Sequence, residues 1–287
     1  MPRRPVLPWQ RDDRPEHRVG QATASFGRTM ALPEPPHCPP AWRTGPPDFI
    51  VVGAQKAGTT WWFRLIESHP DVHQPDGQSP ELHFFDRFFA TWPTTHDIER
   101  YHRFFPRPGS GLAGEKTPTY MSCHWAPEMI RHAAPDARLI AILRDPIARY
   151  VSGRTHEDRR LQVILGTDRD WTNDNRWVEA AFTKGLYAQQ LAWLHASIPA
   201  DRLLVLQYER CVSDPAAQLA RTYAFLGLPP HELRPDELAT ARNVTRADKL
   251  DLEPERRALL VRLYRPDVAE LSRLVPDLDL ALWPDFA

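Results

Sequence analysis

Residues 49–62 read FIVVGAQKAGTTWW. The four apolar residues at the start, ended by Gly53, are typical of a strand buried in a parallel sheet. A helix is expected to begin at Thr59 or Thr60 and to end before Pro70. A strand, a glycine-containing loop and a helix N-terminus in this order form an anion trap, because backbone N–H groups and the helix dipole converge on one point.

The same strand-to-helix transition recurs along the chain. Residues 138–143 (RLIAIL) predict a second strand, and the Asp-Pro pair at 145–146 supplies a cap and a first-turn proline for the next helix. Residues 203–206 (LLVL) predict a third strand, followed by a helix over 214–227. Strands that alternate with helices predict an α/β chain with a three-layer, P-loop-like fold, in which helices flank a central parallel sheet.

The ends of the chain differ in character. Residues 1–47 are rich in proline and arginine and lack periodicity, so we expect a disordered or loosely draped tail there. A single domain is expected over 48–287, with two more helices after Pro254 and Pro266.

The composition is that of an ordinary globular protein, with 42% apolar and 25% charged residues. Lys+Arg number 36 against 37 Asp+Glu, and this absence of a basic excess argues against a nucleic-acid binder. Four of the 36 basic residues are lysines, at positions 56, 116, 184 and 249. A chain that otherwise uses arginine can keep lysine where a compact point charge is needed; codon bias is the alternative.

The sequence shows no pattern for a disulfide, a metal or a membrane span. Cys38, Cys123 and Cys211 form no CxxC pair, and the twelve histidines contain no HExxH. The apolar runs are far shorter than the ~20 residues that span a bilayer, and the N-terminus has no apolar signal region. We therefore expect a cytoplasmic protein without a metal or a membrane span; the oligomeric state is not predicted.

The loop at 53–60 departs from the nucleotide-triphosphate loop GxxxxGK[ST] in one specific way. There a lysine follows the second glycine; here Thr59 takes that place, and the lysine is inside the loop at Lys56. This pattern resembles the 5′-phosphosulfate loop of sulfotransferases that use 3′-phosphoadenosine 5′-phosphosulfate (PAPS). A kinase or hydrolase on the same scaffold and a glycine turn without a ligand are the alternatives.

Residues 143–152, LRDPIARYVS, directly follow the second predicted strand. Arg144 lies where doubly wound sheets bind ligands, and Ser152 is about two turns further along the helix. Together they resemble the arginine and serine that hold the 3′-phosphate in PAPS-dependent sulfotransferases, where the arginine fork meets a phosphate bidentately. RDP alone would fit a helix cap with a solvated arginine, but with both motifs in the family's order the chain is identified as a member.

Three further segments resemble the branch with heparan-sulfate and related bacterial sulfotransferases. Residues 81–85 (ELHFF) are similar to its acidic-x-His-Phe-Phe segment, whose glutamate is the family's catalytic base. Residues 114–120 (GEKTPTY) resemble its Glu-Lys-Ser/Thr-Pro segment beside the reacting centre, and 185–191 (GLYAQQL) resemble its Tyr-x-x-Gln-Leu helix. The resemblance covers 48–287.

Two features depart from the family's pattern. Pro80 stands where the family often has a lysine before the glutamate. The late Lys-Gly-Arg loop that closes over the nucleotide in many members is absent, and residues 242–249 (RNVTRADK) occupy that region. Arg246 and Lys249 are candidate replacements; a solvated loop is the alternative.

The resemblance implies sulfuryl transfer without a metal. Lys56 would stabilise the leaving phosphate, Glu81 would take the acceptor's proton, and Lys116 would support the transferring group or orient the base. We expect partial burial to raise the pKa of Glu81, and His83 is the alternative base. The residues implied to bind the nucleotide are Lys56, Ala57, Gly58, Thr59, Thr60, Trp61, Arg144, Ser152, Arg246 and Lys249.

The acceptor is less defined than the donor. The Arg/Pro-rich composition looks bacterial and favours a small secondary metabolite, a lipid or a sugar, with a hydroxyl favoured over an amine. Residues 86–112 and 154–182 are irregular, aromatic and charged, and we expect them to shape the acceptor site. A degenerate protein that only binds the nucleotide is the non-enzymatic alternative.

Overall fold

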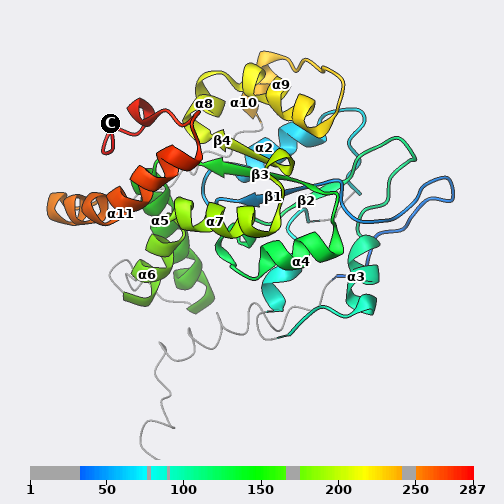
Figure 1. Ribbon diagram of the computed structural model, residues 1–287, viewed down its shortest axis with the longest axis horizontal. Helices are drawn as coiled ribbons and strands as arrows, with labels where there is room; N and C mark the ends of the chain where they lie inside the picture. The colour runs from blue at the N-terminus through cyan, green and yellow to red at the C-terminus, as the bar shows by residue number, and fades with distance from the viewer. Residues whose placement is uncertain (1–32, 76–78, 89–90, 166–174, 241–249) are drawn as a thin grey trace, which may run out of the picture.

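The computed structural model describes residues 33–75, 79–88, 91–165, 175–240 and 250–287 (Figure 1). At its centre is a four-stranded sheet of order β2-β1-β3-β4 in which every neighbouring pair is parallel. The strands are β1 (Phe49–Gly53), β2 (Gly114–Lys116), β3 (Arg138–Leu143) and β4 (Leu203–Gln207).

Ten α-helices are present in the described residues. They are α2 (Thr59–Glu67), α3 (Thr95–His102), α4 (Ala126–Ala133), α5 (Pro146–Leu165), α6 (Asn175–Thr183), α7 (Tyr187–Ser197), α8 (Tyr208–Ser213), α9 (Pro215–Leu226), α10 (Pro235–Thr240) and α11 (Pro254–Leu274). Short 3-10 turns are η2 (Phe85–Arg87), η3 (Tyr120–Ser122), η4 (Ala200–Arg202) and η5 (Leu280–Leu282).

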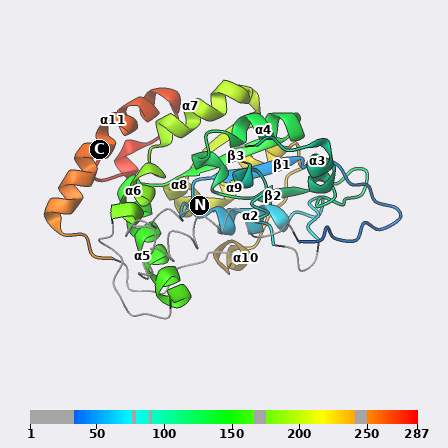
Figure 2. The same ribbon diagram turned by 90° about the horizontal axis from the view of Figure 1, so that it is seen from below.

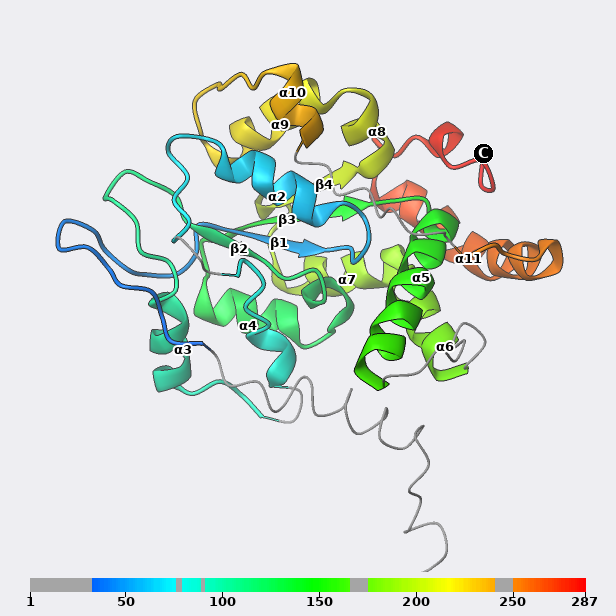
Figure 3. The same ribbon diagram turned by 180° about the vertical axis from the view of Figure 1, so that it is seen from behind.

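The sheet is covered on both faces. Figures 1 and 3 show α2 and α9 on one side of the strands and α4 and α7 on the other, and α11 packs beside α7 (Figure 2). Every residue of β1 is buried, which is why this strand is continuously apolar rather than alternating. The expected three-layer α/β class is confirmed.

Local sequence signals explain most element boundaries. Asp145 caps α5 by accepting a hydrogen bond from the Ala148 N–H at 2.7 Å. Gly227 ends α9 with a φ of 74°, a left-handed conformation that glycine adopts without cost. The predicted strands correspond to β1, β3 and β4.

Two expectations about helices are wrong. Pro266 does not start a new helix but lies inside α11, which runs unbroken from Pro254 to Leu274. The helix continues because Tyr264, Val268 and Leu271 are buried in the core, and this packing outweighs the hydrogen bond that the proline forfeits. Residues 154–182 are also less irregular than expected, since α5 extends to Leu165 and α6 begins at Asn175.

Strand β2 was not predicted from the sequence. It is three residues long and pairs with β1 through Phe49–Gly114 and Val51–Lys116. A Cβ at Gly114 would lie 2.5 Å from the Phe49 carbonyl oxygen, so only glycine lets the two strands approach this closely.

The segment before the domain is described from residue 33 onward. Arg43 pairs with Arg107 through two backbone hydrogen bonds of 2.9 Å, and the buried Arg107 guanidinium lies 2.7 Å from the Asp48 carboxylate. Residues 1–32 lie outside the described part. None of the helices in the described ranges is long and apolar enough to cross a bilayer.

The parallel strands end at one edge of the sheet, and this edge collects the predicted site. The glycine loop follows β1, Lys116 is the last residue of β2, Arg144 follows β3 and Tyr208 follows β4. Ligands of open parallel sheets bind at the carboxyl ends of the strands, so the topology alone brings these segments together.

Candidate active site

The loop after β1 leads into α2 through left-handed backbone. Lys56 has a φ of 70° and Gly58 a φ of 83°. No side chain caps α2, and its first turn has no acidic residue. The N–H groups of that turn are thus available to an anion, as the sequence predicts. A Cβ at Gly58 would lie 2.7 Å from the Tyr208 ring, which restricts the position to glycine.

Arg144 is tied to this loop. Its Nη1 donates to the Lys56 carbonyl oxygen at 3.1 Å, and its guanidinium carbon lies 4.9 Å from the centre of the Tyr208 ring, in a cation–π contact. The ring of Tyr208 therefore borders both Gly58 and Arg144. Tyr208 was not predicted from the sequence, although its place two residues after a predicted strand was a usable signal.

Ser152 lies on α5 and is half-buried. Its neighbour Gly153 faces the loop, because a Cβ there would lie 4.0 Å from Lys56 Cγ. The structure thus brings α5 against the loop beside Ser152.

The ammonium of Lys56 interacts electrostatically with two other predicted site residues, Arg144 and Glu81. Burial and the Arg144 cation lower the pKa of Lys56, while the Glu81 carboxylate opposes that decrease. The loop lysine, the arginine after β3 and the predicted base therefore share one electrostatic environment.

Lys116 and Glu81 form an ion pair at the end of β2. The Lys116 ammonium contacts Glu81 Oε1 and donates to Thr60 Oγ1 at 3.0 Å. The side chain of Lys116 is 3% exposed, whereas that of Glu81 is 37% exposed. Lys116 thus links the predicted base to the first turn of α2.

His83 bridges two carboxylates. Its Nδ1 is 2.7 Å from Asp86 Oδ2 and its Nε2 is 3.5 Å from Glu81 Oε2. The hydrogen bonds to Asp86 and Glu81 raise the pKa of His83 to about 9, against burial, which lowers it. At neutral pH the ring is an imidazolium and has no lone pair with which to accept a proton.

The expected pKa of Glu81 is wrong in direction. Burial alone would raise it, but hydrogen bonds from His83 and Lys116 outweigh burial and lower the pKa of Glu81 to about 2. The expectation failed because it allowed for Lys116 but did not count the imidazolium of His83 as a second cation.

A buried carboxyl group supports the segment of the predicted base, a role that was not predicted for it from the sequence. Glu115 is 1% exposed and accepts hydrogen bonds from the Tyr101 hydroxyl and from Thr117 Oγ1. Thr117 Oγ1 in turn accepts from the His83 N–H at 3.3 Å. Burial raises the pKa of Glu115 to about 7. Another missed residue is Thr119, whose hydroxyl donates to Asp86 at 2.8 Å.

The other predicted nucleotide residues have varied surroundings. Ala57, Thr59 and Trp61 are buried, and the Trp61 indole N–H donates to the Leu238 carbonyl oxygen at 3.1 Å, which anchors α10 to α2. Arg246 and Lys249 lie outside the described residues. Directly after them, the Leu250 N–H donates to Thr155 Oγ1 on α5 at 2.9 Å.

Lys184 joins the site although it was not among the predicted site residues. Its ammonium donates to Gln55 Oε1 in the glycine loop at 2.9 Å. Three of the four lysines of the chain therefore lie at this edge of the sheet, and the scarcity of lysine was the signal for it.

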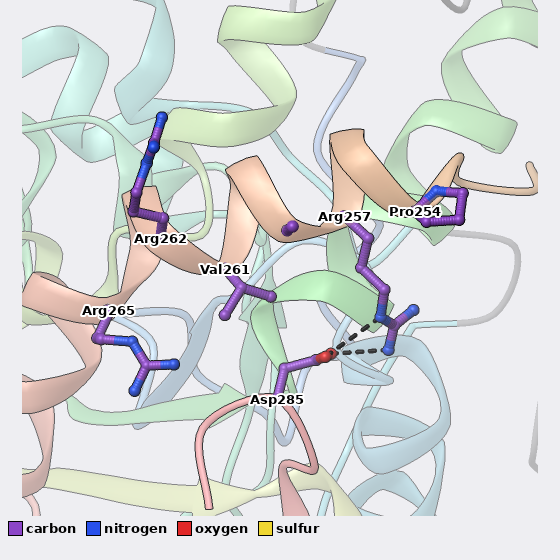
Figure 4. Close-up of a pocket in the computed structure, with 7 residues that line it drawn as sticks. Pro254, Arg257, Val261, Arg262, Arg265 and Asp285 are labelled. Atoms are coloured by element: carbon purple, nitrogen blue, oxygen red, sulfur yellow. Dashed lines mark hydrogen bonds and ion pairs between the residues drawn. The ribbon is translucent and has the colours of Figure 1, made fainter.

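Outside this site, the described residues offer no metal-ligand cluster and one hollow of note. They contain no group of three His, Cys, Asp or Glu side chains that could hold a metal ion. A hollow of about 400 Å³ lies along α11 and shares no residue with the site above (Figure 4). Its lining is cationic, and one of its arginines, Arg257, is paired with Asp285 at 2.7 Å.

Comparisons with known proteins agree with the geometry. Residues 46–250 match the model of the sulfotransferase domain family. Heparan sulfate glucosamine 3-O-sulfotransferase 3B1 of Mus musculus is 34% identical over 191 residues, which are 63% of this chain and 46% of that protein. The chain thus spans about half the length of the curated relatives it matches.

Two solved structures share the fold. A sulfotransferase from Alicyclobacillus acidocaldarius superposes with a TM-score of 0.61 at 24% identity, over 83% of this chain and 98% of that one. Mouse sulfotransferase SULT7A1, complexed with PAP, gives a TM-score of 0.52 at 15% identity, over 80% of this chain and 87% of that one.

Proposed function

This chain belongs to the sulfotransferase domain family, and we propose that it transfers a sulfuryl group from PAPS to a hydroxyl of a small-molecule, lipid or sugar acceptor. The observation that carries the proposal is the convergence of the uncapped loop, Arg144 and the Lys116–Glu81 pair at one edge of the sheet. Sulfuryl transfer needs in-line geometry and charge stabilisation more than it needs covalent catalysis. These groups can supply both the geometry and the charge.

The donor nucleotide would be held at its two ends. The first turn of α2, with Thr59 and Thr60, offers N–H and hydroxyl donors to the 5′-phosphate. Arg144 and Ser152 would hold the 3′-phosphate. Arginine has five N–H donors, and the bond to the Lys56 carbonyl occupies one, so a bidentate contact with phosphate remains open to Arg144.

Lys56 would act on the leaving group. As the sulfur–oxygen bond to the nucleotide breaks, negative charge grows on the 5′-phosphate. A preorganised ammonium at the bridging oxygen stabilises that charge most in the transition state. The strained φ of Lys56 fixes the direction in which its side chain leaves the loop.

Glu81 would take the proton of the acceptor hydroxyl as its oxygen bonds to sulfur. A carboxylate with a pKa of about 2 is a weak base, so the resting pair with Lys116 has to loosen. The sulfuryl oxygens of bound PAPS compete for the Lys116 ammonium. When Lys116 turns to them, the pKa of Glu81 rises toward its ordinary value. His83 stays protonated and orients Glu81.

The names of relatives support a hydroxyl as the acceptor group, and the free thiols support a cytoplasmic location. The name of the mouse relative specifies 3-O-sulfation of glucosamine, which favours a hydroxyl over an amine as the acceptor group here. Cys38, Cys123 and Cys211 are all free thiols, as in a reducing compartment, and we place the activity in the cytoplasm on that ground.

Melting curves with nucleotides test the proposal. At 100 times its dissociation constant a ligand adds about 2.7 kcal/mol of stability, or about 5–10 °C for a domain of this size. 3′-Phosphoadenosine 5′-phosphate (PAP) should give this rise, and ATP should hardly move the curve. Equal shifts contradict the 3′-phosphate contact, and magnesium-dependent ATP turnover would favour the kinase alternative. Labelled PAPS with a panel of hydroxyl compounds, read by mass spectrometry, then identifies the acceptor.

A further inference from the structure

Lys184 has an unusual environment for a lysine. It lies in the turn between α6 and α7, is only partly exposed, and donates to a neutral partner, Gln55 Oε1, at 2.9 Å. Gln55 directly precedes Lys56 in the glycine loop. The ammonium is therefore held against the loop by an amide and not by a carboxylate.

The positive charge around Lys184 lacks a counter-ion in the described part of the chain. No carboxylate there forms an ion pair with Lys184. Glu157 is the acid that acts on it electrostatically, and its carboxylate is paired with Arg160 at 2.6 Å. Arg149, which is fully buried, adds a second cation, and its Nε and Nη1 have no hydrogen-bond partner. Burying cations without an anion is costly, so an anionic ligand would be stabilised beside these two cations.

Lys184 also acts on residues near the reacting end of the site. Besides Gln55, it acts electrostatically on the Cys123 thiol, which also experiences the charge of Asp86, the partner of His83. The pKa of Lys184 is lowered, mainly because burial removes water from its ammonium. This direction is expected for a buried ammonium that has no carboxylate as a direct partner. The donor's phosphates have other partners in the proposed function, so Lys184 is left for a different anion.

We propose that Lys184, aligned by Gln55, binds an anionic oxygen group at the reacting end of the site. Two sources share this chemistry: the transferring sulfuryl group of PAPS, and a carboxylate, phosphate or sulfate substituent on the acceptor. The inference rests on the proposed function, because both sources are ligands of that reaction. Arg149 remains buried and contributes positive potential.

Three variants separate the charge of Lys184 from its shape. Lys184→Met removes the ammonium but keeps an unbranched side chain, and Lys184→Arg keeps the charge. Gln55→Glu gives the ammonium a carboxylate partner in place and so neutralises it without touching Lys184. The matched control is Arg265→Met, which removes a cation from the hollow along α11.

Calorimetric titration provides the measurement, with two arms. The first compares the dissociation constants of PAP and PAPS, which differ by the sulfuryl group. The second uses PAP-saturated protein and compares 4-hydroxybenzoate with 4-hydroxybenzamide, which differ by one charge.

We expect Lys184→Met and Gln55→Glu to raise the dissociation constant of PAPS or of 4-hydroxybenzoate by about tenfold or more. This is the contribution of one charge-assisted hydrogen bond to binding. In Lys184→Met the dissociation constant of PAP should change by less than about twofold. Lys184→Arg should restore most of the loss, and Arg265→Met should match the wild type. A loss confined to PAPS assigns the sulfuryl group, and a loss confined to 4-hydroxybenzoate assigns the acceptor. Unchanged binding of both ligands in Lys184→Met, or an equal loss for PAP in that variant, overturns the inference. Failure of wild-type protein to bind PAP would instead overturn the proposed function.

Discussion

Replacing Glu81 by glutamine tests the assignment of the base, because the change keeps the volume and removes the charge. The carboxylate is the acidic partner of the Lys116 ammonium and also lies within 3.5 Å of His83. Without it, Lys116 retains the hydrogen bond to Thr60 at 3.0 Å.

The structure sets the size of the two effects. Breaking a fully buried ion pair costs about 3–5 kcal/mol, but Glu81 is 37% exposed and solvent screens the loss. We therefore expect a decrease of about 1–2 kcal/mol in the free energy of unfolding, or roughly 2–8 °C in melting temperature. Removal of a general base slows turnover by about 10²–10⁴, which is about 2.7–5.4 kcal/mol in the activation barrier. The kinetic effect is the larger, so the two are separable.

The assay is turnover at saturating PAPS and neutral pH on protein shown to be folded by its melting curve. The rise in melting temperature with PAP should survive in Glu81→Gln, since the nucleotide contacts are elsewhere. His83→Ala is the comparison and should slow the reaction less. If Glu81→Gln keeps more than about a tenth of the wild-type turnover, that is well short of the loss expected for a general base, and the assignment is refuted.

Other residues of the site give further tests. Lys56→Ala should slow turnover by about 10²–10³ with a modest loss of PAPS affinity, whereas Arg144→Ala should cost about 1.5–3 kcal/mol of PAPS binding; slower turnover at saturating PAPS with unchanged affinity would contradict the role of Arg144. Since the pKa of His83 is raised from 6.5 to about 9, its contribution to stability is complete below pH 6.5 and is lost as the pH rises through about 9. Melting temperatures should fall over that interval in the wild type and not in His83→Gln. Gly58→Ala places a Cβ 2.7 Å from the Tyr208 ring at a positive φ; urea unfolding should show a loss of about 1–3 kcal/mol, and an unchanged midpoint would argue against this packing.

The strands differ in how far their sequence predicts them. β1, β3 and β4 are continuous apolar runs because both faces of the sheet are covered, and such runs are legible in the sequence. β2 consists of a glycine, a glutamate and a lysine, whose charges are satisfied by residues distant in the chain. The Glu115 carboxyl accepts a hydrogen bond from the Tyr101 hydroxyl, and the Lys116 ammonium forms an ion pair with Glu81. Because these partners are not next to β2 in the chain, the local sequence resembles a polar loop.

The candidate site shows the same division. The glycine loop and Arg144 were predictable because each directly follows an apolar strand. The direction of the pKa shift of Glu81 was not predictable, because it depends on two cations from different segments that contact the same carboxylate. The contact of Lys184 with Gln55 joins positions 129 apart in the chain, a separation that no local pattern reports. The catalytic and nucleotide-binding roles stay predictions until they are tested.

The position of Tyr208 connects the two proposed phosphate subsites through one side chain. One aromatic ring supports the glycine that opens α2 and the arginine that follows β3. If a phosphate on either side restrains this ring, the second phosphate has less conformational entropy left to remove. A nucleotide that carries both groups therefore gains more than two fragments that carry one each, beyond the gain from covalent linkage. Selectivity for a 3′,5′-bisphosphate is then a property of the connection between the subsites as much as of either one.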